Sequence, residues 1–84
     1  MQPQVKCDPD LARRAILAWQ RKCFREGLLF EQPGQPDCWR RRDGTQIVVL
    51  ANSRGMLAVY RLRSDGLRIA EVKEVPASLR PAYD

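Results

Sequence analysis

The apolar residues of this 84-residue chain follow one spacing before residue 31 and another after residue 37. In the first part, four apolar residues recur at steps of four, three and four, which is the spacing of one face of an α-helix. This stripe consists of Ala12, Ile16, Trp19 and Cys23. In the second part, apolar and polar residues alternate, as they do in β-strands. The change of spacing predicts an α+β fold in which one N-terminal helix packs on a sheet.

The two ends of the helix carry clear signals. Asp8 can cap the free backbone amides, Pro9 suits the first helical position, and Asp10 places negative charge at the positive end of the helix dipole. Gly27 is a typical residue for ending a helix. We therefore expect a helix between Asp8 and Gly27, with Trp19 as its main anchor on the sheet.

The rest of the helix surface is apolar on one flank and basic on another. Leu17 and Phe24 lie on the flank, and we expect another segment to cover them, such as residues 28–33 (LLFEQP) folding back. The opposite face is basic and carries Arg14, Arg21 and Arg25. Such a face binds acidic partners or a membrane surface, or is simply solvated.

Three turn sequences divide the second half of the chain: Asp43-Gly44, Asn52-Ser53-Arg54-Gly55 and Asp65-Gly66. The strands expected between them are Cys38–Arg42, Gln46–Ala51, Met56–Arg63 and Leu67–Val75. Short hairpins join neighbouring antiparallel strands, so these four predict an antiparallel β-meander. We expect residues 1–7 to be a flexible arm, residues 8–75 a single α+β domain, and residues 76–84 a C-terminal tail.

Both faces of the expected sheet carry apolar rows. If Ala51 pairs with Met56, one face of the central strands holds Ile47, Val49, Ala51, Met56, Ala58, Tyr60 and Leu62. The other face then holds Val48, Leu50, Leu57 and Val59 with Arg61 and Arg63. A single helix covers only one face. The second face requires the tail, a second copy of the chain or a partner protein, or else it is an exposed interaction patch.

A tryptophan and three consecutive arginines precede the first turn. Alternation along a strand places Arg40 and Arg42 on one face, and Trp39 with Arg41 on the other. The arginines either protect an edge strand against aggregation or form part of a binding surface. With the helix arginines, the candidate binding residues are Trp39, Arg40, Arg41, Arg42, Arg61, Arg63, Arg14, Arg21 and Arg25.

Enzymatic chemistry has little support in this sequence. The chain has no histidine, no catalytic serine motif and no phosphate-binding glycine loop. Its three cysteines, Cys7, Cys23 and Cys38, lack metal-ligand spacing, and we expect reduced, partly buried thiols. We therefore expect a protein without catalytic residues, metal or cofactor. The chain also lacks a membrane-spanning stretch and a signal-peptide pattern, so we expect a soluble, cytoplasmic protein.

Two functions remain open. The 15 basic and 10 acidic residues give a net charge of +5, which favours acidic partners. The first hypothesis is a small non-catalytic interaction module or accessory subunit that uses a basic surface and an apolar sheet face, with an acidic protein or a second copy of the chain as partner. The alternative is binding of RNA or single-stranded nucleic acid through the arginines of the sheet and helix.

The chain also resembles a group of known sequences. The stretch WQRKCFREGLLFEQP, followed by DGTQIVVLANSRGMLAVYRLRSDGLRIAEV, resembles short uncharacterised proteins of photosynthetic bacteria. These pair a W-x-x-K-C-type helix with a D-G-T hairpin meander, and the resemblance covers about residues 8 to 75. It implies a helix on a β-meander and no assigned activity.

Overall fold

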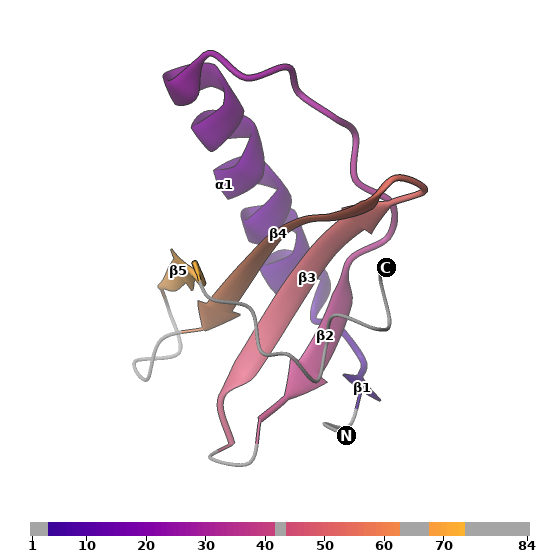
Figure 1. Ribbon diagram of the computed structural model, residues 1–84. Helices are drawn as coiled ribbons and strands as arrows, with labels where there is room; N and C mark the ends of the chain where they lie inside the picture. Colours follow the sequence, from indigo (N-terminus) through magenta and orange to yellow (C-terminus); the bar gives the residue numbers. More distant parts are fainter. Residues whose placement is uncertain (1–3, 42–43, 63–67, 74–84) are drawn as a thin grey trace.

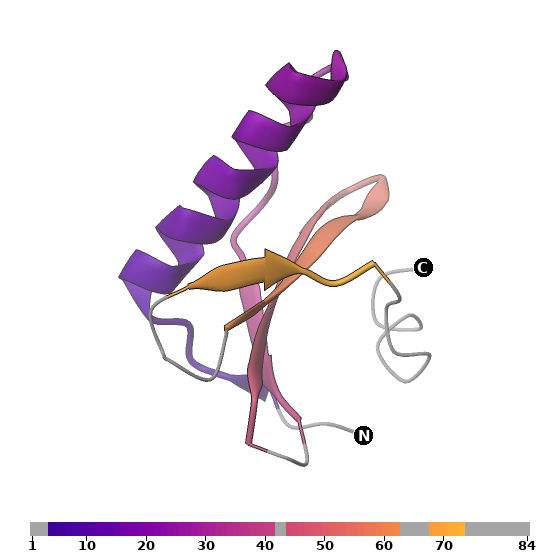
Figure 2. The same ribbon diagram turned by 90° about the vertical axis from the view of Figure 1, so that its left-hand side faces the viewer.

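The structure is a computed structural model that describes residues 4–41, 44–62 and 68–73. Along the described chain, the elements are β1 (Gln4–Val5), α1 (Pro9–Glu26), β2 (Asp37–Arg40), β3 (Gln46–Asn52), β4 (Gly55–Leu62) and β5 (Ile69–Glu71) (Figure 1). The strands form one antiparallel sheet in the order β1-β2-β3-β4-β5. Figure 2 shows α1 lying against one side of this sheet. The α+β class is thus confirmed.

Helix α1 has the ends that the sequence predicts. The Asp8 carboxylate accepts a hydrogen bond of 2.8 Å from the backbone N–H of Asp10, and Pro9 is the first helical residue. At the other end Gly27 adopts a left-handed conformation with φ of 68°. Glycine takes this conformation without the steric cost that a side chain adds. Both predicted helix signals are therefore confirmed.

The buried row of α1 is rotated relative to the predicted stripe. Its members, four residues apart, are Leu11, Ala15, Trp19 and Cys23. Ala12 and Ile16 of the predicted stripe are only partly buried, at the margin of this row. The apolar surface of the helix is wider than one stripe, so spacing alone does not show which row lies at its centre. Trp19 is the expected anchor, and only 7% of its surface is exposed.

The hairpin of β3 and β4 contains a register shift. The expected pair Ala51–Met56 is present, but Leu50 pairs with Ala58, so Leu57 is an extra residue on β4. A shift of one residue exchanges the two faces of a strand. The expected division of side chains between the faces is therefore wrong. The face toward α1 carries Val48, Leu50, Ala58 and Tyr60, and the other carries Ile47, Val49 and Val59.

The second face of the sheet is buried as well. Trp39 from β2 is 9% exposed, and Ile47, Val49 and Val59 beside it are each 1% exposed. Met56 and Val72 pack against this cluster. These side chains are buried within the single chain and leave no open apolar patch among them. This face is therefore not the exposed interaction patch that the sequence left open.

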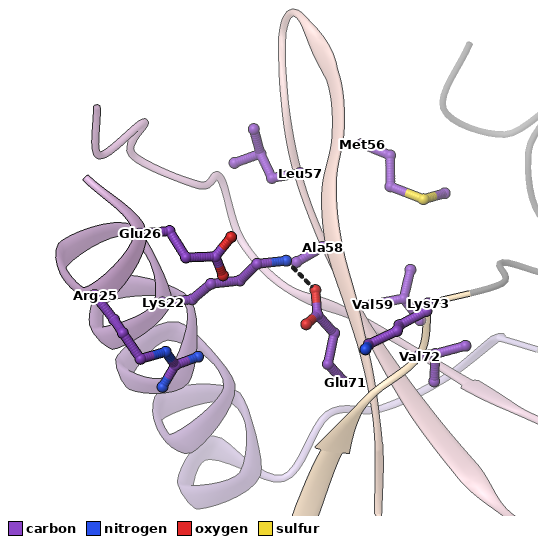
Figure 3. A pocket seen from close by; sticks show the side chains of 10 residues that line it. All are labelled: Lys22, Arg25, Glu26, Met56, Leu57, Ala58, Val59, Glu71, Val72 and Lys73. Atoms are coloured by element: carbon purple, nitrogen blue, oxygen red, sulfur yellow. Dashed lines mark hydrogen bonds and ion pairs between the residues drawn. The ribbon is translucent and has the colours of Figure 1, made fainter. Parts of the chain in front are cut away.

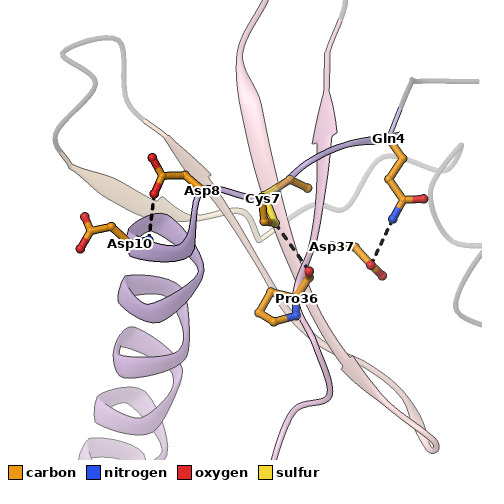
Figure 4. Close-up of a disulfide and its surroundings, with 7 residues drawn as sticks. Gln4, Cys7, Asp8, Asp10, Pro36 and Asp37 are labelled. Carbon is orange, nitrogen blue, oxygen red and sulfur yellow. Dashed lines mark hydrogen bonds between the residues drawn. A yellow bond between two sulfur atoms is a disulfide. The ribbon is translucent and has the colours of Figure 1, made fainter.

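The expected four strands are one too few, because the N-terminal residues form a strand. Gln4 and Val5 pair with Trp39 and Cys38 of β2. A two-residue strand has too few positions to show alternation, so its sequence gave no signal. It reaches the sheet beside Cys7, which is joined to Cys38 by a disulfide (Figure 4).

This disulfide overturns the expectation of three reduced thiols. The Cα atoms of Cys7 and Cys38 are 5.2 Å apart, within the range that a disulfide requires. The Sγ atom of Cys7 also lies 3.5 Å from the carbonyl oxygen of Pro36, but only the reduced thiol has a proton to donate there. The 31 residues that separate the two cysteines hide the pairing from any local pattern. Cys23 is the free thiol and is buried in the helix interface.

Two strands are shorter than expected. β2 ends at Arg40 rather than at Arg42, and β5 spans Ile69–Glu71 rather than Leu67–Val75. The turn at Gly44 has φ of 88°, which glycine accommodates and which supports the first expected hairpin. Several predicted features lie outside the described residues: Arg42, Asp43, Arg63, Asp65-Gly66 and the tail 76–84.

Candidate functional site

The outward side of α1 carries large apolar side chains that nothing in the described chain covers. Leu17 is 39% exposed and Phe24, seven residues later, is 90% exposed. Directly after the helix, Leu28 is 49% and Leu29 86% exposed. Single exposed apolar residues are ordinary, but two on the outward side of α1 and two directly after it form a surface that water solvates poorly.

Residues 28–33 do not fold back over this surface, so that expectation is wrong. Instead, this segment turns toward the sheet. Phe30 packs against the core beneath the helix, and the backbone oxygen of Glu31 accepts a hydrogen bond of 3.1 Å from Nε1 of Trp19. The segment thus satisfies the buried indole N–H of Trp19, which needs a partner. Leu17 and Phe24 stay exposed as a result.

Basic side chains lie beside the exposed apolar residues. Arg21 and Arg25 are exposed, and Arg14 is partly exposed. None of the three forms an ion pair within the described chain, whereas Arg13 is paired with Asp10 at 2.9 Å. We call the outer helix surface the set formed by Leu17, Phe24, Leu28 and Leu29 with Arg14, Arg21 and Arg25.

A groove runs beside this surface, between the second half of α1 and the strands β4 and β5 (Figure 3). Its cavity has a volume of about 720 Å³ and is lined by Lys22, Arg25 and Glu26 of the helix and by Leu57, Glu71 and Lys73 of the sheet side, among others. An ion pair between Lys22 and Glu71 crosses the groove. A second cavity of about 280 Å³ shares Lys22, Arg25 and Glu71 with the first. We call it the Tyr60 pocket, because Tyr60 also lines it.

Three titratable groups near the groove have shifted pKa values. The hydrogen bond from Lys22 to Glu71 raises the pKa of the lysine above its ordinary value, although burial opposes this. Burial raises the pKa of the Tyr60 hydroxyl to about 12, and the charge of Glu71 adds to the rise. Burial also raises the pKa of the Cys23 thiol, so this cysteine is not an activated nucleophile.

The arginines predicted for the sheet do not form one patch. Arg40 pairs with Gln46, on the face that Cys38 shares with the helix core, whereas Arg61 pairs with Ile47 on the second face. Both are exposed, but on opposite sides. Arg41 is partly buried. The groups that the structure does bring together are Arg14, Arg21 and Arg25 on α1.

Trp39 also differs from its expected role as a binding residue. Only 9% of its surface is exposed, and it packs in the second core cluster with Ile47. A ring buried to this degree has no free face on which a base can stack. Sequence reasoning missed Leu28 and Leu29 as surface residues, because it expected residues 28–33 to fold back over the apolar flank of the helix.

Within the described residues, no group of His, Cys, Asp and Glu side chains is arranged to hold a metal ion. None of the described helical segments combines the length and the apolarity that crossing a membrane requires. The fold and surface define a small α+β domain with a basic and apolar helix on an antiparallel sheet. Comparisons with protein families, curated proteins and solved structures found no match.

Proposed function

We propose that this chain is a small non-catalytic interaction module that binds an acidic protein partner through the outer helix surface. The observation that carries the proposal is Phe24, 90% exposed, on the same helix as Arg21 and Arg25, which form no ion pair within the described chain. A partner helix or strand with apolar and acidic residues complements both features. Apolar contact supplies affinity at the centre of such an interface, and charge at the rim supplies orientation and a faster encounter.

A second copy of the chain is a poorer partner than an acidic protein. Two outer helix surfaces in contact bring Arg14, Arg21 and Arg25 of one copy toward the same residues of the other. Like charges placed together at an interface cost several kcal/mol. The net charge of +5 adds a weaker repulsion over longer distances. Both effects favour a partner of opposite charge.

Nucleic acid is also a poorer partner for this surface. Phosphate groups use arginines but gain nothing from exposed leucine side chains, and base stacking requires accessible aromatic rings. Trp39 is buried, and Arg40 and Arg61 lie on opposite faces. Phe24 is the one exposed aromatic ring on the described helix. The described surface therefore offers an isolated stacking group rather than a platform.

The proposal is tested by affinity capture from lysate with and without nuclease, using the wild type and two double variants. Phe24→Ala with Leu29→Ala removes exposed apolar groups, and Arg21→Glu with Arg25→Glu reverses the charge. Because all four residues are exposed, both variants are expected to keep the wild-type melting temperature to within a few degrees. The matched control is Arg61→Glu, which changes an exposed arginine of β4 on the sheet face that points away from α1.

An acidic protein that is captured after nuclease treatment, lost in both double variants and retained by Arg61→Glu supports the proposal. Capture of nucleic acid that is released by a high-salt wash contradicts it. A concentration-dependent dimer that dissociates in the Phe24→Ala, Leu29→Ala variant also contradicts the proposal, because the partner is then a second copy.

A further inference from the structure

The Tyr60 pocket contains a buried hydroxyl that has no hydrogen-bond partner among the described residues. Tyr60 is 4% exposed, and its side chain reaches the cavity beneath α1 that Ala18, Arg21, Lys22, Arg25 and Glu71 complete. Its hydroxyl forms no hydrogen bond within the described chain. A buried hydroxyl normally has a hydrogen-bond partner, because an unsatisfied one costs free energy. An acceptor for this hydroxyl therefore has to lie in the cavity itself.

The charges around the pocket favour an anion. Arg21, Lys22 and Arg25 face one carboxylate, Glu71, and this carboxylate is already bound to Lys22. Both arginines are left without an acidic partner in the described chain. Guanidinium groups and a hydroxyl are donors that suit an oxyanion with two acceptor atoms. The hydroxyl remains protonated at neutral pH, so it is available as a donor.

The pocket fits a carboxylate better than a phosphate. Glu71 lines the same cavity, and its negative charge repels a phosphate, with close to two charges, more than a carboxylate with one. The volume of about 280 Å³ is at or below the lower limit for pockets that hold drug-sized ligands. An acidic side chain needs less room than such a ligand.

We infer that the Tyr60 pocket binds the carboxylate of an Asp or Glu side chain of the partner, held by the Tyr60 hydroxyl and the guanidinium groups of Arg21 and Arg25. This inference rests on the proposed function and names the group by which the acidic partner is recognised. The same two arginines belong to the outer helix surface. The pocket thus lies close to the outer helix surface. A partner that packs an apolar residue on Phe24 can place a neighbouring Asp or Glu side chain in the pocket.

The test uses the full chain and a small probe, so it does not depend on finding the partner. N-acetylglutamate N-methylamide is titrated into labelled protein, while NMR follows the Tyr60 ring and the guanidinium N–H signals of Arg21 and Arg25. The matched control is N-acetylglutamine N-methylamide, which has nearly the same shape but no charge. Inorganic phosphate is the third probe.

We expect saturable, weak binding of the glutamate probe with shifts at all three residues, and little effect of the glutamine probe. Tyr60→Phe, which removes only the hydroxyl, is expected to weaken binding about tenfold, and Arg21→Gln by a similar factor. Lys6→Gln, an exposed change outside the pocket, is expected to have no effect. A thermal melt shows whether the Tyr60→Phe variant is folded. If it is not, the Arg21→Gln variant still tests the pocket.

Equal binding of the two amino-acid probes, or tighter binding of phosphate, overturns the inference. So does a titration in which the Tyr60 signals do not move. None of these results affects the capture experiment with Phe24 and Leu29, so failure of the pocket and failure of the interaction surface are separate outcomes.

Discussion

The Cys7–Cys38 disulfide is expected to carry a large share of the stability of this domain. It joins residues 31 positions apart and restricts the unfolded chain far more than the folded one. For a loop of this length, the chain-entropy relation gives about 3 to 4 kcal/mol at 25 °C. A domain of this size has a total stability of roughly 4 to 13 kcal/mol, so reduction removes a substantial part of it.

The assay is urea unfolding of the wild type, followed by circular dichroism, with and without a reductant. With a slope of about 1.5 kcal/mol per molar, the expected loss lowers the urea midpoint by roughly 2 to 2.7 M. Cys7→Ala combined with Cys38→Ala is the control in which the reductant has no further effect. Cys23→Ala retains the bond, so it keeps the response. An unchanged wild-type midpoint in reductant, with the bond shown to be open, would refute the reasoning.

Three further predictions concern the helix and groove. Trp19→Ala is expected to lower the free energy of unfolding by about 3 to 5 kcal/mol, because Trp19 is buried. Phe24→Ala, at an exposed site, is expected to change it by less than about 0.5 kcal/mol. Equal effects of the two variants in urea unfolding contradict the packing of Trp19 against the sheet. Because the pKa of Tyr60 is raised to about 12 by folding, the unfolded state ionises first, and stability falls between pH 10 and 12 by about 2 to 3 kcal/mol. Tyr60→Phe lacks that part of the alkaline loss, and an identical pH profile of the two proteins argues against the shift. Glu71→Gln breaks the ion pair with Lys22 at the edge of the groove. Because this pair is partly solvated, we expect a stability loss below about 1 kcal/mol in thermal unfolding, and a larger loss contradicts this reasoning.

Local signals predicted the helix and the main hairpin well. The cap at Asp8, the stop at Gly27 and the pair Ala51–Met56 each depend on residues close together in sequence, and all three are present. The predicted assignment of side chains to the two faces of the sheet was wrong because of the register shift beside Leu50. Nothing in the alternation of residues 46–63 announces an extra residue, because both possible registers bury apolar side chains.

Long-range contacts were the features that the sequence did not reveal. The disulfide and strand β1 both depend on residues 4–7 meeting β2, 31 to 35 positions later. The disulfide also bears on the predicted cytoplasmic location, because the cytoplasm keeps most thiols reduced. The unfolding experiment tests the bond, whereas the cytoplasmic location stays a prediction.

The sequence placed most of the candidate binding residues on the sheet, whereas the structure favours the helix. Both carry arginines, so the burial of the neighbouring side chains, rather than charge, decides between them. The run at residues 39–42 has the highest density of arginine, yet Trp39 is buried and alternation separates its neighbours. The helix carries four arginines, and two of them, Arg21 and Arg25, form no ion pair within the described chain and lie near Phe24, which faces solvent. Charge in a sequence indicates an acidic partner without locating it. We propose that the outer helix surface marks its place, because several exposed apolar groups beside arginines suit an interface better than open water.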